Sequence, residues 1–254
     1  MLTALTHLPS ADLNSCELTY ISSERIDPVS AAQQHQRYRR ALTELGARVI
    51  TLNKNLDLPD SVFVEDTAIV LDEIAIITSM GAGSRRPERE LIVTELAKYR
   101  PVEHIGLPAT IEGGDVLRIG KKIFVGKSSR TNDQGIAALG KIVKPIGYEI
   151  VPVNVSGCLH LKTGCTALDD STILINYNWI DTGAFQNFKK IEVPEAEPFA
   201  ANILRIDDTI CIHSGFTETS DLLRDRGFEI KKIDISEFLK AEAGLTCMSL
   251  IFEM

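Results

Sequence analysis

One cysteine, one histidine and two acidic clusters are the side chains of this 254-residue chain best suited to covalent chemistry. Cys247 lies in "GLTCMSLIF" at the entrance of an apolar run, which predicts a thiol in a loop rather than in the core. Equivalent loop positions recur at intervals of 42 to 49 residues: Asp66, Asp115, His160, Asn202 and Cys247. This regular interval predicts that the five positions belong to one repeated unit and meet in a shared cleft.

A thiol, an imidazole and carboxylates in one pocket are typical of nucleophilic catalysis. The thiolate of Cys247 would attack, and His160 would carry a proton to or from the leaving group. The pocket would hold more carboxylates than a catalytic triad needs: Glu65, Asp66, Glu112 and Asp115. Surplus negative charge raises the pKa of a thiol, so it suits an enzyme whose substrate is a cation. A guanidinium matches paired carboxylates with its planar donors.

Two arginines also repeat. Arg85 in "GSRR" and Arg130 in "SSRTN" each follow the second strand of a predicted hairpin. Paired arginines bind a carboxylate through forked hydrogen bonds, although solvated charges at a helix start are the simpler interpretation of each alone. Acids for a guanidinium and arginines for a carboxylate together describe an arginine-like amino acid.

Each motif has a structural interpretation when taken alone. "SVFVED" could be a strand ending in solvated acids, "EGGD" a turn, and His160 a buried structural histidine. Cys158 and Cys165 in "CLHLKTGC" lack the second ligand pair that a zinc site needs. The recurrence of reactive groups at one repeat position favours the catalytic interpretation.

The elements that must position these groups form a repeat. Apolar hairpins with central turn residues are predicted at 68–78, 116–126, 167–177 and 203–213. Helical segments are predicted at 87–99, 132–143 and 217–227, while the third unit lacks a convincing helix. Closing strands are predicted at 102–105, 148–153 and 228–235. The last unit begins at 248–252 and continues with the helix 33–46 and the strand 47–52.

These units predict an α/β fold in which five strand–strand–helix–strand blades pack around a common axis. No linker interrupts them, so we expect residues 1–254 to form a single catalytic domain whose two chain ends share one blade.

Composition sets limits on the partners. The net charge of −8 argues against nucleic acid, and no apolar run reaches the length of a membrane span. Five cysteines make an odd set without tight spacing, so a disulfide framework is not expected. The first 20 residues lack the pattern of a signal peptide, which predicts a cytoplasmic protein.

The chain resembles the dimethylarginine dimethylaminohydrolase family of the guanidino-group modifying, or pentein, superfamily. The resemblance covers nearly the whole chain and is carried by "LPDSVFVEDTAIV", "GAGSRRPERE", "EGGDVL", "FVGKSSRTN", "LHLKTG", "AAN" and "LTCMSL". It implies the pentein fold, a five-bladed pseudo-symmetric ββαβ propeller, in agreement with the repeat.

The resemblance also implies roles for individual residues. Cys247 stands at the position of the nucleophile, His160 at that of the general acid and base, and Glu112 at that of the third catalytic residue. The implied substrate-binding residues are Leu18, Asp60, Phe63, Glu65, Asp66, Arg85, Arg130 and Ala241. Asp115 and Asn202 are expected to shape the loops, and neither a metal nor an organic cofactor is implied.

The implied reaction converts Nω-methylated arginines to citrulline and methylamine or dimethylamine through a covalent thiouronium on the cysteine. An arginine deiminase, a hydrolase of another guanidino compound, and a non-catalytic pentein binding module remain as alternatives. The sequence leaves open the oligomeric state, a homodimer included, and the choice between monomethyl and dimethyl substrates.

Overall fold

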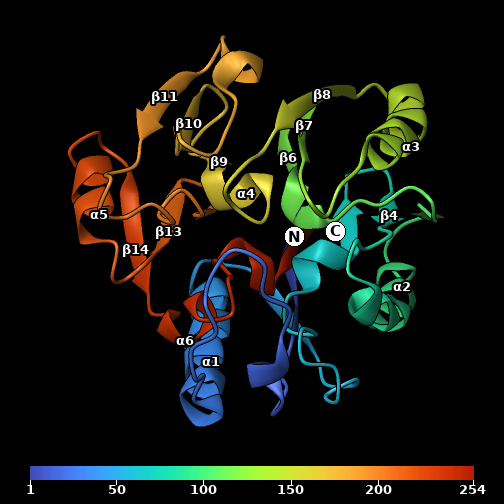
Figure 1. Cartoon of the computed structure of the whole chain (residues 1–254), viewed down its shortest axis with the longest axis horizontal. Coiled ribbons are helices and arrows are strands. Elements are labelled where there is room, and N and C mark those ends of the chain that lie inside the picture. Colours follow the sequence, from blue (N-terminus) through green and yellow to red (C-terminus); the bar gives the residue numbers. More distant parts are fainter.

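The computed structural model describes all residues, 1–254, and contains five three-stranded sheets. In every sheet the first strand pairs antiparallel with the second, and the second pairs parallel with the third. Figure 1 shows the sheets arranged around a central axis with the long helices on the outside. The predicted five-bladed propeller is therefore confirmed.

Four of the sheets are built from strands that follow one another along the chain. One contains β3 (Ala68–Val70), β4 (Ala75–Ile77) and β5 (Val102–His104). The next contains β6 (Val116–Ile119), β7 (Lys122–Lys127) and β8 (Glu149–Asn154). A third contains β9 (Cys165–Ala167), β10 (Thr172–Ile175) and β11 (Lys189–Glu192). The fourth contains β12 (Leu204–Ile206), β13 (Thr209–His213) and β14 (Glu229–Ile233).

The fifth sheet joins the two ends of the chain. It contains β15 (Leu250–Glu253), β1 (Leu2–His7) and β2 (Arg48–Leu52). β1 is the central strand and pairs antiparallel with β15 and parallel with β2. β1 was not predicted from the sequence, because "LTALTH" lacks an alternating pattern. Five of its six residues are nevertheless buried.

The hairpin turns lie where their residues predict them. Ile119 pairs with Lys122 across Gly120, whose φ of +58° needs a residue that tolerates the left-handed region. Ile206 pairs with Thr209 in the same way across Asp207, at φ +50°.

The helices cover the outside of the sheets. They are α1 (Pro28–Glu44), α2 (Arg89–Leu96), α3 (Asp133–Val143) and α5 (Thr217–Arg224). The Asp27 carboxylate caps α1 by accepting from the amides of Val29 and Ser30. α2 is shorter than predicted, because Pro87 lies in the 3-10 helix η3 (Gly83–Glu88) that precedes it. As expected, the third unit has no α-helix, and only the 3-10 helix η6 (Thr182–Phe185) lies between β10 and β11.

Short helical turns precede the first strand of four sheets and carry the candidate residues. These turns are η2 (Val64–Thr67), η4 (Gly113–Asp115), α4 (Leu161–Gly164) and η7 (Thr246–Met248). Each lies at most one residue before its strand, so the ring of sheets brings all four to the same axis. The remaining short elements are η1 (Leu13–Ser15), η5 (Lys144–Ile146) and α6 (Ser236–Leu239).

The core is divided into five clusters rather than one. In the largest, Tyr38 and Leu42 of α1 pack with Phe238 of α6 and with Met248 beside the nucleophile candidate. The Tyr38 hydroxyl donates to the carbonyl oxygen of Leu245 at 3.0 Å, which fixes η7 to α1. None of the helices has the length and apolar character to cross a membrane.

Candidate active site

A small cavity, named here the Cys247 cavity, lies where the helical turns meet. Residues proposed from the sequence make up most of its wall: Asp60, Phe63, Asp66, Arg85, Arg130, His160, Ala241 and Cys247. Its free volume is about 20 Å³, room for little more than one water molecule. Glu112, Glu65 and Leu18 are outside this wall, and each has a different place, described below.

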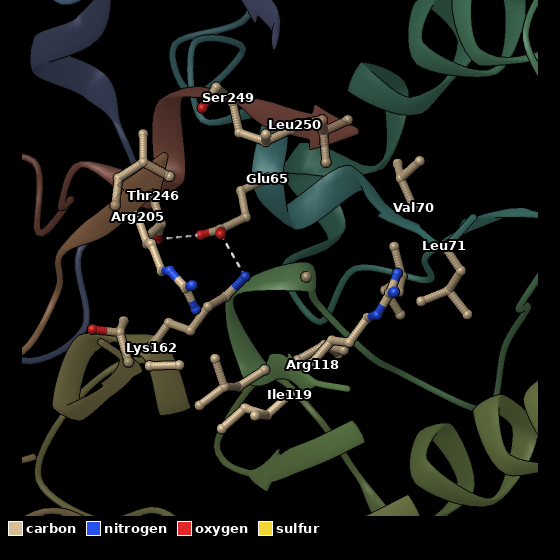
Figure 2. Close-up of a pocket in the computed structure, with 18 of the residues that line it drawn as sticks. Glu65, Val70, Leu71, Arg118, Ile119, Lys162, Arg205, Thr246, Ser249 and Leu250 are labelled. Atoms are coloured by element: carbon tan, nitrogen blue, oxygen red, sulfur yellow. Dashed lines mark hydrogen bonds and ion pairs between the residues drawn. The ribbon is translucent and has the colours of Figure 1, made fainter. Parts of the chain in front are cut away.

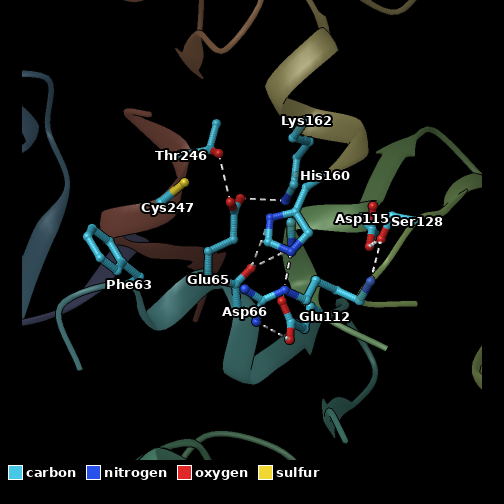
Figure 3. A network of polar contacts seen from close by, with 12 residues as sticks. Phe63, Glu65, Asp66, Glu112, Asp115, Ser128, His160, Lys162, Thr246 and Cys247 are labelled. Carbon is cyan, nitrogen blue, oxygen red and sulfur yellow. Dashed lines mark hydrogen bonds and ion pairs between the residues drawn. The ribbon is translucent and has the colours of Figure 1, made fainter. Parts of the chain in front are cut away.

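His160 is held between two acids (Figure 3). Its Nε2 lies 2.7 Å from Oε2 of Glu112, and its Nδ1 lies 3.9 Å from Oδ1 of Asp66. Burial opposes the charged imidazole, but Asp66, Asp115 and the bond to Glu112 outweigh it and raise the pKa of His160 to about 9. His160 is therefore protonated at neutral pH and can act as an acid.

Glycine at 114 makes this arrangement possible. A Cβ there would lie 2.6 Å from Nδ1 of His160 and 2.8 Å from Oδ1 of Asp66. The amide of Gly114 donates to the same Asp66 oxygen at 3.0 Å. The imidazole thus packs directly on the backbone of η4.

Cys247 lies in η7 and is half-buried. Its Sγ accepts from the amide of Gly244 at 3.3 Å. Burial, together with Glu65 and Asp66, raises the pKa of Cys247 to about 12. The two acids act on this thiol in the direction expected from the sequence, although burial has the larger effect on its pKa.

Arg85 differs from its predicted role as a free carboxylate ligand. Its guanidinium is 5% exposed and donates to Oδ2 of Asp66 at 2.7 Å and to both oxygens of Glu88 at 3.1 and 3.0 Å. It also donates to the carbonyl oxygen of Phe63 at 3.1 Å. Four of its five N–H donors are therefore used inside the protein, and forked binding of a substrate carboxylate by Arg85 would require a change of partners.

Arg130 has fewer bonds. Its Nη2 donates to Oγ1 of Thr19 at 3.1 Å, and its Nη1 lies 3.8 Å from Oε1 of Glu112. Of the two arginines, Arg130 is the one with donors available to a carboxylate in the cavity.

Glu65 faces away from the Cys247 cavity and lines a larger one of about 360 Å³ on the same axis. Figure 2 shows its carboxylate bonded to Lys162 and to Oγ1 of Thr246, the latter at 2.7 Å. Residues one or two positions apart on each turn thus line different cavities. The larger cavity is lined by Glu65, Lys162 and Thr246, and the Cys247 cavity by Asp66, His160 and Cys247.

Asp115 and Asn202 orient the turns, as expected. Asp115 accepts from the Leu161 amide at 2.9 Å and from Ser128 Oγ at 2.6 Å, which anchors the start of α4 beside His160. Asn202 accepts from the Thr246 amide at 3.1 Å and donates to the Lys162 carbonyl at 3.0 Å.

A segment at residues 17–20, named here the strap, lies against the cavity. The Asp60 carboxylate accepts from the amide of Glu17, and the Glu242 carboxylate accepts from the amides of Thr19, at 2.7 Å, and Tyr20, at 3.1 Å. Leu18 is partly exposed within the strap and is not in the cavity wall.

Two residues of the site were not identified from the sequence. Lys162 follows His160 by two positions in "LHLKTG", and the surplus of predicted acids was a signal that a cation had to lie among them. Glu242 has no local signal, because its importance comes from bonds to residues more than 220 positions away.

Asp66, Glu112 and His160 could also hold a metal ion, since one ligand atom of each lies within 4.8 Å of the others. Arg85 already bonds to Asp66, and His160 to Glu112. A metal would have to displace these contacts.

Comparison with known proteins agrees with this geometry. Residues 11–250 match a family model described as N,N dimethylarginine dimethylhydrolase, eukaryotic. N(G),N(G)-dimethylarginine dimethylaminohydrolase of Streptomyces coelicolor is 37% identical over 97% of this chain and 95% of its own length. The protein of that name from Pseudomonas aeruginosa is 35% identical over 89% of this chain and 90% of its own.

Solved structures show the same similarity. A cysteine-to-serine mutant of the Pseudomonas aeruginosa enzyme complexed with citrulline matches with a TM-score of 0.94 and 33% identity, over 99% of this chain and all of that chain. The N-terminal domain of a cyanobacterial arginine dihydrolase matches with a TM-score of 0.84 at 19% identity, which shows a shared fold. With the family model matched across most of its length, the chain belongs to the dimethylarginine dimethylaminohydrolase family.

Proposed function

We infer that this protein hydrolyses Nω-methylated arginines, asymmetric dimethylarginine and monomethylarginine, to citrulline and dimethylamine or methylamine. The observation that carries this function is the Cys247 cavity, where a thiol, a protonated imidazole and the Asp66 carboxylate share one wall. Relatives at 35% and 37% identity carry the name of this activity, and one solved relative binds citrulline.

The wall of the cavity carries groups for the two ends of such a substrate, and because the cavity holds little more than one water molecule, it must widen when the substrate binds. The guanidinium would lie beside Asp66 and the ring of Phe63, both buried in the wall. The α-carboxylate would bind Arg130, and the α-amino group would approach Asp60. Asp66 would meet the guanidinium as a carboxylate anion, because the nearby His160 and Arg85 outweigh its burial and lower its pKa.

The first step forms a carbon–sulfur bond. Before substrate binds, Cys247 is a neutral thiol, as its pKa of about 12 requires. The arriving cation offsets the negative field of Glu65 and Asp66 and lowers the pKa of the thiol. The thiol then releases its proton to solvent, and the thiolate attacks the guanidinium carbon to form a neutral tetrahedral adduct.

Protonated His160 then donates its proton to the methylated nitrogen, and the carbon–nitrogen bond breaks to release the amine. A thiouronium remains on Cys247. Neutral His160 accepts a proton from water as the water oxygen attacks the same carbon, and the carbon–sulfur bond breaks to give citrulline and the free cysteine.

The test is a substrate panel with citrulline and amine both measured. Wild-type protein should convert dimethylarginine and monomethylarginine, and arginine far more slowly. Cys247→Ser should lose at least about 10³-fold in kcat. Cys211→Ala is the matched control, because Cys211 is buried in β13 outside the cavity and should keep its activity. Equal turnover of arginine with ammonia release would instead identify a deiminase.

We also propose that residues 1–254 act as one catalytic domain in the cytoplasm. β1 and β15 pair in one sheet, and all five cysteines are free, as a reducing compartment favours. Light scattering of the pure protein tests for the homodimer that the sequence leaves open.

A further inference from the structure

Lys162 is a largely buried charged residue that the reaction above does not use. Its ammonium bonds to the Glu65 carboxylate, and the two side chains are 15% and 9% exposed. Lys162 makes no other ion pair, and Glu65 is bonded to no other cation. Each group therefore depends on the other for its counter-charge, because a buried charge without a partner is costly.

Hydrogen bonds join this ion pair to the turn that carries Cys247. The second oxygen of Glu65 accepts from Oγ1 of Thr246 at 2.7 Å, and Thr246 directly precedes Cys247 in η7. Asn202 links the two turns, since it donates to the Lys162 carbonyl at 3.0 Å and accepts from the Thr246 amide at 3.1 Å. Figure 3 shows the sulfur of Cys247 pointing toward the Glu65 carboxylate. The negative charge of Glu65 is thus held in a fixed place beside the nucleophile.

Each of the two acids that act on Cys247 has a basic partner. Asp66 is bonded to Arg85 at 2.7 Å, and Glu65 is bonded to Lys162. Burial has the largest effect in raising the pKa of the thiol, followed by Glu65 and Asp66, and Lys162 acts in the opposite direction. Lys162 therefore opposes, at the sulfur, the charge of the carboxylate that it holds.

This compensation matters because the substrate of the proposed reaction carries a single positive charge. With Lys162 in place, both carboxylates are paired before the substrate arrives. Without it, Glu65 would keep an uncompensated charge, and the substrate would have to offset that charge before the thiol could ionise.

We propose that Lys162 is a positioning residue for the nucleophile: through Glu65 it cancels negative charge beside Cys247, so that one bound cation is enough to form the thiolate. The ammonium acts without touching the substrate, because Lys162 lines the larger cavity and not the Cys247 cavity. The consequence for turnover rests on the proposed function, whereas the effect on the thiol is measurable without substrate.

The first experiment measures how readily Cys247 forms its thiolate in the free, full-length protein. Iodoacetamide is uncharged, and its reaction rate follows the fraction of thiolate at the half-buried sulfur. The alkylated Cys247 peptide is quantified by mass spectrometry at pH 9.5. This pH is above the pKa of about 8 to 9 that buried glutamates reach, so Glu65 is ionised in every variant that retains it.

Lys162→Met should slow this alkylation about tenfold or more, because the thiolate fraction falls tenfold for each unit by which the thiol pKa rises. Lys162→Arg should react at nearly the wild-type rate, since it keeps the charge and the larger cavity has room for its side chain. Lys98→Met is the matched control, because it removes an exposed lysine and its pair with Glu95 near the end of α2. It should react like wild type.

Replacing Glu65 separates the charge from the structure. Glu65→Gln leaves Lys162 without its acid and should speed alkylation about tenfold, whereas Glu65→Gln combined with Lys162→Met should return the rate to within about threefold of wild type. A pair that only stabilises the fold predicts rates at or above wild type in every variant, because a loosened turn exposes the thiol. If Lys162→Met does not fold, the comparison of Glu65→Gln with the double variant decides, since neither leaves a carboxylate at position 65.

Turnover of dimethylarginine supplies a second readout. In Lys162→Met, kcat should fall about tenfold while KM stays equal or falls, because the uncompensated carboxylate still attracts the cation. Alkylation of folded Lys162→Met at or above the wild-type rate, or equal rates in Glu65→Gln and the double variant, would overturn the proposal. Absence of turnover by the wild-type protein would instead reject the hydrolase function, and the alkylation result would stand by itself.

Discussion

Nε2 of His160 and Oε2 of Glu112 lie 2.7 Å apart, and both side chains are removed from solvent. The other Glu112 oxygen accepts from the Gly81 amide at 2.9 Å, so the carboxylate has a fixed position. Asp66 lies on the opposite side of the ring, at 3.9 Å from Nδ1. The two acids therefore stabilise the protonated imidazole, which can donate its proton to the leaving group.

Replacing Glu112 tests that relationship. Glu112→Gln keeps a hydrogen-bond acceptor for His160 but removes the charge, so the pKa of His160 should fall and kcat/KM should drop about 100-fold. NMR titration of the His160 ring and steady-state kinetics measure the two effects. Glu103→Gln, at an exposed position of β5, is the matched control. An unchanged His160 pKa would show that Glu112 does not set its charge.

The raised pKa of His160 also predicts how stability depends on pH. Because the folded pKa of about 9 exceeds the ordinary 6.5, the contribution of His160 is fully present below pH 6.5 and is lost as the pH rises through 9. The difference in unfolding free energy between wild type and His160→Gln should therefore shrink by about 3 kcal/mol from pH 6 to pH 10. Urea unfolding at both pH values measures it. A difference that stays constant or grows would contradict the assignment.

Arg130→Ala should weaken binding of the substrate carboxylate. With dimethylarginine, KM should rise about 10- to 100-fold, the loss expected for a charge-assisted hydrogen bond. Dimethylagmatine, which has the guanidinium but no carboxylate, provides the control and should be turned over equally by both proteins. Equal loss with both substrates would mean that Arg130 acts through Glu112, 3.8 Å away, rather than on the carboxylate.

Arg85→Ala should chiefly lower the free energy of unfolding rather than the affinity for substrate. Its removal leaves Asp66 and Glu88 buried without their cation, at a cost of about 3 to 5 kcal/mol. Arg86→Ala is the matched control, because Arg86 is more exposed and has no ion pair. Thermal unfolding compares the variants, and a melting temperature equal to that of wild type would refute the structural role.

Gly114→Ala tests the packing of His160 on the backbone. The added methyl would lie 2.6 Å from Nδ1 of His160, so the ring must move and kcat should fall about 100-fold or more. Gly106→Ala is the control, because a Cβ there meets nothing within 4 Å. Wild-type activity in Gly114→Ala would show that the position of the imidazole is not critical.

Much of the fold followed from local patterns. Hairpins with central turns at Gly120 and Asp207 are encoded in neighbouring residues, and their regular spacing specified five units around an axis. The same spacing placed Asp66, His160 and Cys247 at equivalent turns, which the structure brings into one cavity. β1 was missed because its burial comes from being the central strand between β15 and β2, not from its own pattern.

The sequence by itself determined which turns meet and which reactive groups they carry. Only the tertiary structure decided which residue of each turn faces which cavity, since one step along a 3-10 turn redirects a side chain by about 120°. Packing between blades paired Glu65 with Lys162, whereas Arg85 pairs within its own blade, with Asp66 of η2 and with Glu88 three residues further along η3. The bonds between Glu242 and the strap join residues more than 220 positions apart. Pairs that join different blades depend on how the blades are placed relative to one another, and no local sequence pattern specifies that placement.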